Sequence, residues 1–409
     1  YAAVLEWETR EGYQAPGHIV IAEVDLPSGR VHEWHRVTTG FTTRGCVEAP
    51  QIYQHGGYYY LLLASGGTGY AHGVEIGRSK EIFGPYEPNP TGEPIITSSP
   101  HHLFSLGDPD AGHFEMYNPH SKLQKSGHGS LVETPDGRWY MAHLTSRPLP
   151  SQKLNPLGRE TALQEMRWTQ EGWLELADGS NLAKETVTVP GTVKQDRQAV
   201  DVEDHFAADH YDHRFMTPYH GQSSDWVTVQ DGHLLISGRN SLFSQVAPSI
   251  MGTRATSLHY DLQTKVTFHP DHYSETAGVG LYYDANNWFY VRLVQADNER
   301  ETVLRVLQAK QGQRIDDYLD EVPVPDESVE VRLRYDEGQV VVAYRFTSQD
   351  EWQQLGGRYD LAYLSDEGVN GEPGEIGGFT GLFNFIGAVD AYQHQSVGKF
   401  AYYSVHNRD

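Results

Sequence analysis

The sequence predicts an all-β protein with two domains, in which a series of short strands precedes a β-sandwich. With 409 residues the chain is too long for one ordinary domain. Up to about residue 188 it consists of short strands separated by Gly, Pro and Asp turns, with no helical period of 3.6 residues. Strand–turn–strand units of this kind fit propeller blades as well as any other all-β fold. The second half instead carries long strands that alternate apolar and polar residues, which is typical of a sandwich.

In the first domain we expect strands at residues 17–24 and 138–143, the latter following a turn at Asp136-Gly137. The amino terminus, residues 1–7, has the pattern of the middle of a strand. It lacks a basic region and a starting Met, so it does not have the pattern of a signal peptide.

Residues 98–121 interrupt the series of short strands, and we expect a surface insertion there. The insertion contains the four histidines His101, His102, His113 and His120 and two aspartates. Their spacing matches no defined set of metal ligands, which makes a metal site in the insertion a minor alternative.

A polar stretch at residues 189–200 predicts a linker, and residues 201–409 form the second domain. In residues 328–335 the odd positions are apolar, and in residues 338–346 Val340, Val342 and Tyr344 share one face. Residues 277–292 predict a hairpin that turns at residues 284–287. These strands support a sandwich.

The net charge is −24 and the isoelectric point is about 5.2. Nucleic-acid binding is therefore not expected, because it requires a basic surface. An acidic surface also repels anionic membranes, and no apolar run approaches the roughly 20 residues of a membrane span. The single cysteine, Cys46, excludes an intramolecular disulfide, and we expect it to be a small buried apolar residue rather than a reactive one. We expect a soluble protein, either cytoplasmic or secreted.

The chemistry is concentrated around Glu48. Residues 47–53 (VEAPQIY) are followed at once by the aromatic-rich strand of residues 57–64 (GYYYLLLA), between glycine-containing turns. A glutamate at the mouth of such a strand can point into a cleft. The alternative is a solvated glutamate before a strand, since this residue type is mostly exposed.

Three motifs in this order resemble glycoside hydrolase family 43, in its two-domain β-xylosidase and α-L-arabinofuranosidase branch. They are residues 48–70 (from EAPQIY to GGTGY), residues 127–134 (GHGSLVET) and residues 157–162 (LGRETA). Residues 277–292 resemble the accessory domain of the same branch. The resemblance implies a partial five-bladed β-propeller over residues 1–188, followed by a concanavalin-like β-sandwich.

The resemblance also implies roles for individual residues. Glu48 matches the general acid, which must hold a proton to protonate the leaving oxygen. Thr68 matches a residue near the sugar at the cleaved end, although a turn-capping role is equally compatible. His128 matches a histidine that in several relatives helps hold a central cation through water, so a Ca²⁺ ion is one alternative and a metal-free buried histidine the other. Arg159 matches an arginine that binds the sugar hydroxyls with its rigid fork of donors, the alternative being a surface pair with Glu160.

The two remaining carboxylates of the family, both Asp, match no residue of this chain and are expected upstream of Tyr1, together with about two blades of the propeller. The sequence at Asp108–Asp110 is similar to the base motif, but it follows the acid and lies in the insertion, so we reject it. The missing blades would be partners of this chain, from the same precursor or from a separate chain. Without them residues 1–409 are not expected to be a competent enzyme.

The leading hypothesis is an exo-acting, inverting glycosidase that releases xylose or arabinofuranose from xylo-oligosaccharides or arabinoxylan fragments and needs no cofactor for the chemistry. The alternative is a non-catalytic carbohydrate-binding protein on the same scaffold. In this branch a loop of the sandwich helps close the active site. The matching stretch is residues 381–390, with Phe385 expected on a core face and Asp390 at the strand exit, and both are candidates for substrate binding. The sequence leaves open the choice of sugar and whether the protein is a homo-oligomer.

Overall fold

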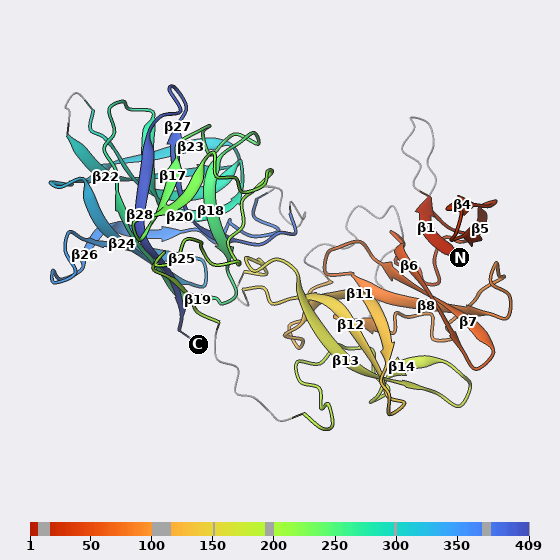
Figure 1. The fold of residues 1–409 in the computed structure, drawn as a ribbon. Helices are drawn as coiled ribbons and strands as arrows, with labels where there is room; N and C mark the ends of the chain where they lie inside the picture. The colour runs from red at the N-terminus through yellow and green to blue at the C-terminus, as the bar shows by residue number, and fades with distance from the viewer. Residues whose placement is uncertain are drawn as a thin grey trace. The chain divides into compact units, whose positions relative to one another are not determined.

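The computed structural model describes residues 1–6, 17–99, 116–149, 152–192, 200–297, 301–369 and 378–408. In these ranges the long regular elements are all β-strands, many of which are labelled in Figure 1. Among the described residues no helix is long and apolar enough to cross a membrane. The chain divides into two compact units, the first formed by Tyr1–Lys153 and Arg159–Val193, the second by Leu154–Gly158 and Lys194–Asp409. The all-β fold class is as predicted.

Three antiparallel sheets form the blades of the first unit. In spatial order the first sheet is β1-β2-β5, the second β10-β8-β7-β6 with β9 on β8, and the third β11-β12-β13-β14. The small ribbon β3-β4 extends from the first sheet. Their bounds are β1 Ala2–Glu6, β2 His18–Ala22, β3 Val24–Asp25, β4 Arg30–Val31, β5 His35–Thr38, β6 Glu48–His55, β7 Tyr58–Ser65, β8 Gly73–Ser79, β9 Glu87–Pro88, β10 Ile96–Thr97, β11 Gln124–Glu133, β12 Trp139–Ser146, β13 Glu160–Trp168 and β14 Leu174–Leu176.

The hairpin between β6 and β7 shows how the sequence directs this fold. Gly56 and Gly57 have φ angles of 55° and 81°. A two-residue turn in which both residues have positive φ matches the right-handed twist of the flanking strands and favours glycine. Strand β7 that follows is buried along most of its length because it lies between β6 and β8. The chain therefore turns directly after β6 and brings the end of β7 back beside Glu48.

Two sheets form the sandwich of the second unit. One has the order β16-β17-β28-β19-β24-β25-β26 with β15 on β28, and the other β18-β27-β20-β21-β22-β23. Their bounds are β15 Val202–Asp204, β16 Val227–Gln230, β17 His233–Ser237, β18 Ser249–Arg254, β19 His259–Thr267, β20 Glu275–Asp284, β21 Asn287–Gln295, β22 Thr302–Lys310, β23 Gln313–Pro323, β24 Ser328–Asp336, β25 Gln339–Arg345, β26 Gln353–Asp360, β27 Phe383–Asp390 and β28 Val397–Asn407.

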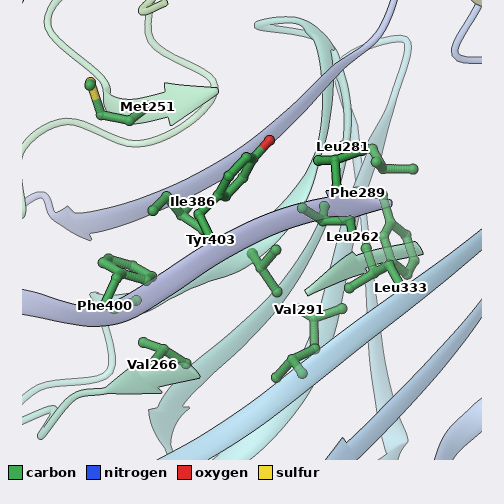
Figure 2. Packing of buried hydrophobic residues seen from close by; sticks show 14 of the residues in the cluster. Met251, Leu262, Val266, Leu281, Phe289, Val291, Leu333, Ile386, Phe400 and Tyr403 are labelled. Atoms are coloured by element: carbon green, nitrogen blue, oxygen red, sulfur yellow. The ribbon is translucent and has the colours of Figure 1, made fainter. Parts of the chain in front are cut away.

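The core of this unit lies between the two sheets, and Figure 2 shows part of it. One sheet contributes Leu262, Val266, Leu333, Phe400 and Tyr403, and the other contributes Met251, Leu281, Phe289, Val291 and Ile386. The predicted alternation in β24 and β25 is confirmed, because Val329, Val331, Leu333, Val340 and Val342 are all fully buried here. The predicted hairpin is also confirmed, with Asp284 paired to Asn287.

The second unit also contains a short segment from far earlier in the chain, Leu154–Gly158. The Asn155 backbone N–H donates to the Glu367 carboxylate at 2.7 Å, and the Leu382 N–H donates to the Pro156 carbonyl at 2.8 Å. Gly158 and Gly381, both at positive φ, approach so closely that a Cβ on Gly158 would lie 2.6 Å from the Gly381 nitrogen. The sequence analysis began the second domain at residue 201 and did not assign Leu154–Gly158 to it.

Candidate active site

Glu48 and the loop that holds Thr68 lie at the same edge of the second blade. Glu48 is the first residue of β6 and pairs with Ala64 near the end of β7. The loop from Gly66 to Tyr70 follows β7 directly and leads into β8, which begins opposite Ser65. Antiparallel pairing therefore brings together two motifs that are separated by a whole hairpin.

The backbone around Glu48 departs from a regular strand. Cys46 and Ala49 have φ angles of 47° and 50°, and the pairing with β7 shifts register between Glu48 and Gln51. Such conformations are costly for residues other than glycine and are concentrated at functional sites. The Glu48 side chain is half-buried, and no described residue donates a hydrogen bond to its carboxylate. That leaves the carboxylate available to a ligand.

Cys46 does not have the predicted environment, because it is exposed rather than buried. The left-handed turn at Gly45 and Cys46 directs Val47, not Cys46, into the apolar cluster beneath β6. Partial burial of the sulfur atom, helped by the nearby charge of Glu48, raises the pKa of the Cys46 thiol. A raised pKa leaves little reactive thiolate at neutral pH.

His128 lies in β11, the strand of the third blade that is tied to β6. Gln51 donates from its side chain to the Gly129 carbonyl at 3.1 Å, and the Leu131 N–H donates to the Tyr53 hydroxyl at 2.9 Å. Register shifts flank His128, which itself has a φ of 53°. These contacts join the backbone of β11, which carries the half-buried His128 side chain, to the strand that begins with Glu48.

The glycines on either side of His128 are required by close packing. A Cβ on Gly127 would lie 2.4 Å from the ring of His72, and one on Gly129 would lie 2.4 Å from the Met141 sulfur. Contacts below 3.0 Å are not tolerated by real Cβ atoms, so neither position accepts a side chain without rearrangement.

Arg159 immediately precedes β13 and donates from its guanidinium to the backbone carbonyl of Thr68. The alternative partner, Glu160, is held by Arg147 through two bonds of 2.9 and 2.7 Å. Arg159 therefore joins the third blade to the Thr68 loop, and part of its fork of donors is fixed by a backbone acceptor. Glu48, Thr68, His128 and Arg159 are all placed on connected edges of two neighbouring blades.

His72 belongs to the same group, although the sequence analysis did not select it. It is fully buried, its Nδ1 atom lies 3.1 Å from the Lys125 carbonyl, and its ring centre lies 6.5 Å from that of His128. Its Nε2 atom has no hydrogen-bond partner among the described residues. Burial, helped by the positive charge of Arg159, lowers the pKa of His72 to about 3, so the imidazole is neutral at physiological pH. The sequence signal that points to His72 is Gly127, whose lack of a side chain allows the His72 ring to approach β11.

The sequence analysis also missed Arg44, which binds backbone carbonyls near the blade edge that holds Glu48 and Thr68. Its fully buried guanidinium donates to the Ala71 and Ser99 carbonyls, each at 2.6 Å, and burial lowers its pKa to about 10. Nearby Glu75 accepts from the Phe41 N–H at 2.8 Å, and burial raises the pKa of its carboxyl. These buried groups fix the backbone on both sides of the site.

Phe385 and Asp390 belong to the second unit, and the contacts of Asp390 do not match the predicted role in substrate binding. Phe385 is 1% exposed and packs with Tyr282 and Tyr290. The buried Asp390 carboxylate accepts four backbone N–H bonds, from Tyr392, Gln393, Gln395 and Ser396. Burial alone would raise the pKa of Asp390, but these bonds outweigh it and the pKa lies well below its ordinary value. Asp390 holds its own turn instead of facing a ligand.

We expect Asp390→Asn to lower the free energy of unfolding by about 2 kcal/mol at pH 7, because two or more charge-assisted bonds weaken. A carboxyl whose folded pKa is depressed stabilises the fold above its unfolded pKa of about 3.9 and loses this contribution as the pH falls. Urea unfolding of both proteins at pH 7 and at pH 3 measures this. A difference that is absent at pH 7, or larger at pH 3, would contradict the structural role.

The Ca²⁺ ion predicted beside His128 would need several oxygen ligands from the surrounding residues. Among the described residues, no group of three or more His, Cys, Asp or Glu side chains could hold a metal ion. Ca²⁺ prefers six to eight oxygen ligands, which two imidazoles do not supply. The side chains described around His128 therefore do not form a Ca²⁺ cage. The metal site weighed as a minor alternative in the insertion falls largely on residues 100–115, which lie outside the described residues.

Taken together, these groups define a class of protein. A half-buried carboxyl on an irregular strand end, an oriented guanidinium and two neighbouring imidazoles are suited to protonating a glycosidic oxygen while binding sugar hydroxyls. Their position on the edge of propeller blades, in a chain that also carries a β-sandwich, is that of a glycoside hydrolase.

Comparison with known proteins gives the family. Residues 1–174 match the model described as glycosyl hydrolases family 43, and residues 203–406 match the β-xylosidase C-terminal concanavalin A-like domain. The xylosidase/arabinosidase 43B of Humicola insolens is 32% identical over 97% of this chain and 70% of its own length. A β-xylosidase of Bacillus subtilis is 29% identical over 98% of this chain and 73% of its own. The crystal structure of a xylan β-1,4-xylosidase from Bacillus halodurans superposes with a TM-score of 0.88 at 29% identity, covering 99% of this chain and 73% of that one. The chain belongs to glycoside hydrolase family 43, in its two-domain branch.

Proposed function

We propose that this protein is an exo-acting, inverting glycosidase that removes xylose or arabinofuranose from the ends of xylo-oligosaccharides or arabinoxylan fragments. The observation that carries the proposal is the arrangement of Glu48, His128 and Arg159 on connected blade edges, in a chain whose relatives are named xylosidases and arabinosidases. No observation favours the non-catalytic alternative.

In this proposal Glu48 is the general acid. Glycosidic cleavage requires a carboxyl group that donates a proton to the leaving oxygen as the bond breaks. The Glu48 carboxyl is half-buried and receives no hydrogen bond from a described residue, so its proton can pass to a bound substrate. The positive φ of Ala49, the next residue, is part of the irregular backbone that positions the Glu48 side chain.

Arg159 and His128 bind the sugar that is released. The Thr68 carbonyl orients the Arg159 guanidinium, and a planar fork of donors is a group suited to adjacent sugar hydroxyls. The His72 ring beside His128 is uncharged, so it adds no positive charge to the site that contains the proton donor Glu48. The hydrated Ca²⁺ predicted beside His128 stays a prediction, and no step of this proposal depends on it.

An inverting reaction also needs a second carboxylate that activates water on the opposite face of the sugar. We assign this base to none of the described residues. In our proposal it lies on the additional propeller blades that the resemblance places upstream of Tyr1, and these blades complete the active site.

Hydrolysis of nitrophenyl β-D-xyloside and nitrophenyl α-L-arabinofuranoside tests the proposed function. We expect the natural polypeptide that contains residues 1–409 to release nitrophenol from at least one of them. Binding of both sugars without any release would support a carbohydrate-binding protein instead.

A further inference from the structure

The six-stranded sheet of the second unit has one face that is not part of the core in Figure 2. Side chains alternate between the two faces of a strand. In β21, Phe289 and Val291 enter the core, whereas Trp288, Tyr290 and Arg292 have the opposite parity and lie on the other face. We call this second surface the outer face.

The outer face holds a cavity of about 200 Å³, which includes Trp288, Tyr290 and Arg292 in its lining. Its volume lies below the range typical of drug-sized ligands and suits one small ring. Among the described residues, the charged side chains in the lining are those of two arginines, Arg292 and Arg314. In a chain with a net charge of −24, a cavity with exclusively positive lining charges favours an anionic ligand.

The charge of Arg292 is incompletely balanced. Its guanidinium donates to Asp316 at 3.1 Å, and Arg314 donates to the same carboxylate at 2.8 Å, so two cations share one anion. Arg292 is 7% exposed, and its Nε atom is buried with no hydrogen-bond partner among the described residues. Burial also lowers the pKa of Arg292. A buried, unpartnered donor on a charged group is costly, and a second carboxylate in the cavity would satisfy it.

The cavity also offers aromatic surface. Trp288 and Tyr290, which are buried in the protein, form part of its wall. Tyr273, also in the lining, is 70% exposed. An exposed aromatic ring beside a small cavity is a surface on which the apolar face of a sugar ring can stack. Hydroxyl groups of Ser274 and Thr276 add polar contacts in the lining.

We propose that this cavity binds an acidic monosaccharide unit, with its carboxylate on Arg292 and Arg314 and its ring on Tyr273. The site belongs to the second unit, whereas Glu48 belongs to the first, and it would hold polysaccharide chains that carry uronic acid groups. The inference rests on the proposed function only for the identity of the polysaccharide. The carboxylate-binding cavity itself is argued from the second unit alone.

The test is calorimetric titration of the Glu48→Gln protein, which separates binding from turnover, with D-glucuronate and with D-glucose at low salt. We expect glucuronate to bind and glucose to bind far more weakly. Arg314→Gln and Tyr273→Ala, both at exposed side chains, should each weaken glucuronate binding by about tenfold through a lost charged contact or a lost stacking surface. Arg358→Gln, an exposed arginine in β26 of the other sheet, is the matched control and should have no effect.

Equal binding of glucose and glucuronate, or equal effects of Arg314→Gln and Arg358→Gln, would overturn the inference. So would inorganic phosphate that competes as well as glucuronate while Tyr273→Ala changes nothing, because that describes a general anion site. Arg292→Lys provides a second variant that retains the charge and should weaken binding through loss of the fork of donors. Hydrolysis of nitrophenyl xyloside by the unaltered protein is scored separately, so failure there contradicts only the proposed function.

Discussion

Replacing Glu48 by glutamine should lower kcat/KM for xylobiose by about 10²–10⁴-fold, the usual contribution of a positioned general acid. Glutamine keeps the shape of the side chain but has no proton to give. The loss on nitrophenyl xyloside should be much smaller, because nitrophenolate leaves without protonation. Steady-state kinetics of the variant on both substrates measures the difference.

Glu133→Gln is a suitable control, because Glu133 is an exposed glutamate at the end of β11 in the same unit. It should leave both rates unchanged. Equal and small losses on the two substrates in the Glu48 variant would show that Glu48 is not the acid.

Replacing Arg159 by methionine should lower kcat/KM for xylobiose by about 100-fold, since it removes charged hydrogen bonds worth about 1.5–3 kcal/mol each. The variant also releases the Thr68 carbonyl and with it the loop after β7. Arg159→Lys should recover only part of the loss, because an ammonium group lacks the planar fork that can hold the carbonyl and the sugar together.

Arg138→Gln is the matched control for Arg159. Arg138 is 43% exposed and pairs with Asp136 at 3.3 Å, so its removal takes away the same charge at the surface of the same unit. Full activity of Arg159→Met, or a loss no larger than that of Arg138→Gln, would remove Arg159 from the site.

Much of the fold was predictable because its determinants are local. The paired glycines at residues 56 and 57 direct one hairpin, and the alternation of β24 and β25 directs the core face of the sandwich. The edge that holds Glu48 also follows from local pairing, since β6 and β7 are joined by a two-residue turn.

The missed features depend on contacts between distant segments. Arg44 and His72 are ordinary polar residues in the sequence, and only the folded blades bury them against Ser99 and Lys125. Asp390 stands at the end of a strand, where the sequence suggests a ligand-binding loop. Its carboxylate instead accepts backbone N–H bonds from the turn that follows it. The segment Leu154–Gly158 joins residues more than two hundred positions later, as the Asn155–Glu367 bond shows with a separation of 212.

The most direct measurement of the central claim is the time course of products from xylohexaose, followed by chromatography and by NMR of the released anomers. The protein used is the natural polypeptide that contains residues 1–409, with its Glu48→Gln variant as control. The account predicts xylose and xylopentaose as the first products, with xylose released first as the α anomer from its β linkage, and loss of both in the variant. Internal fragments at the earliest times, β-xylose as the first anomer, or unchanged products in the variant would contradict it.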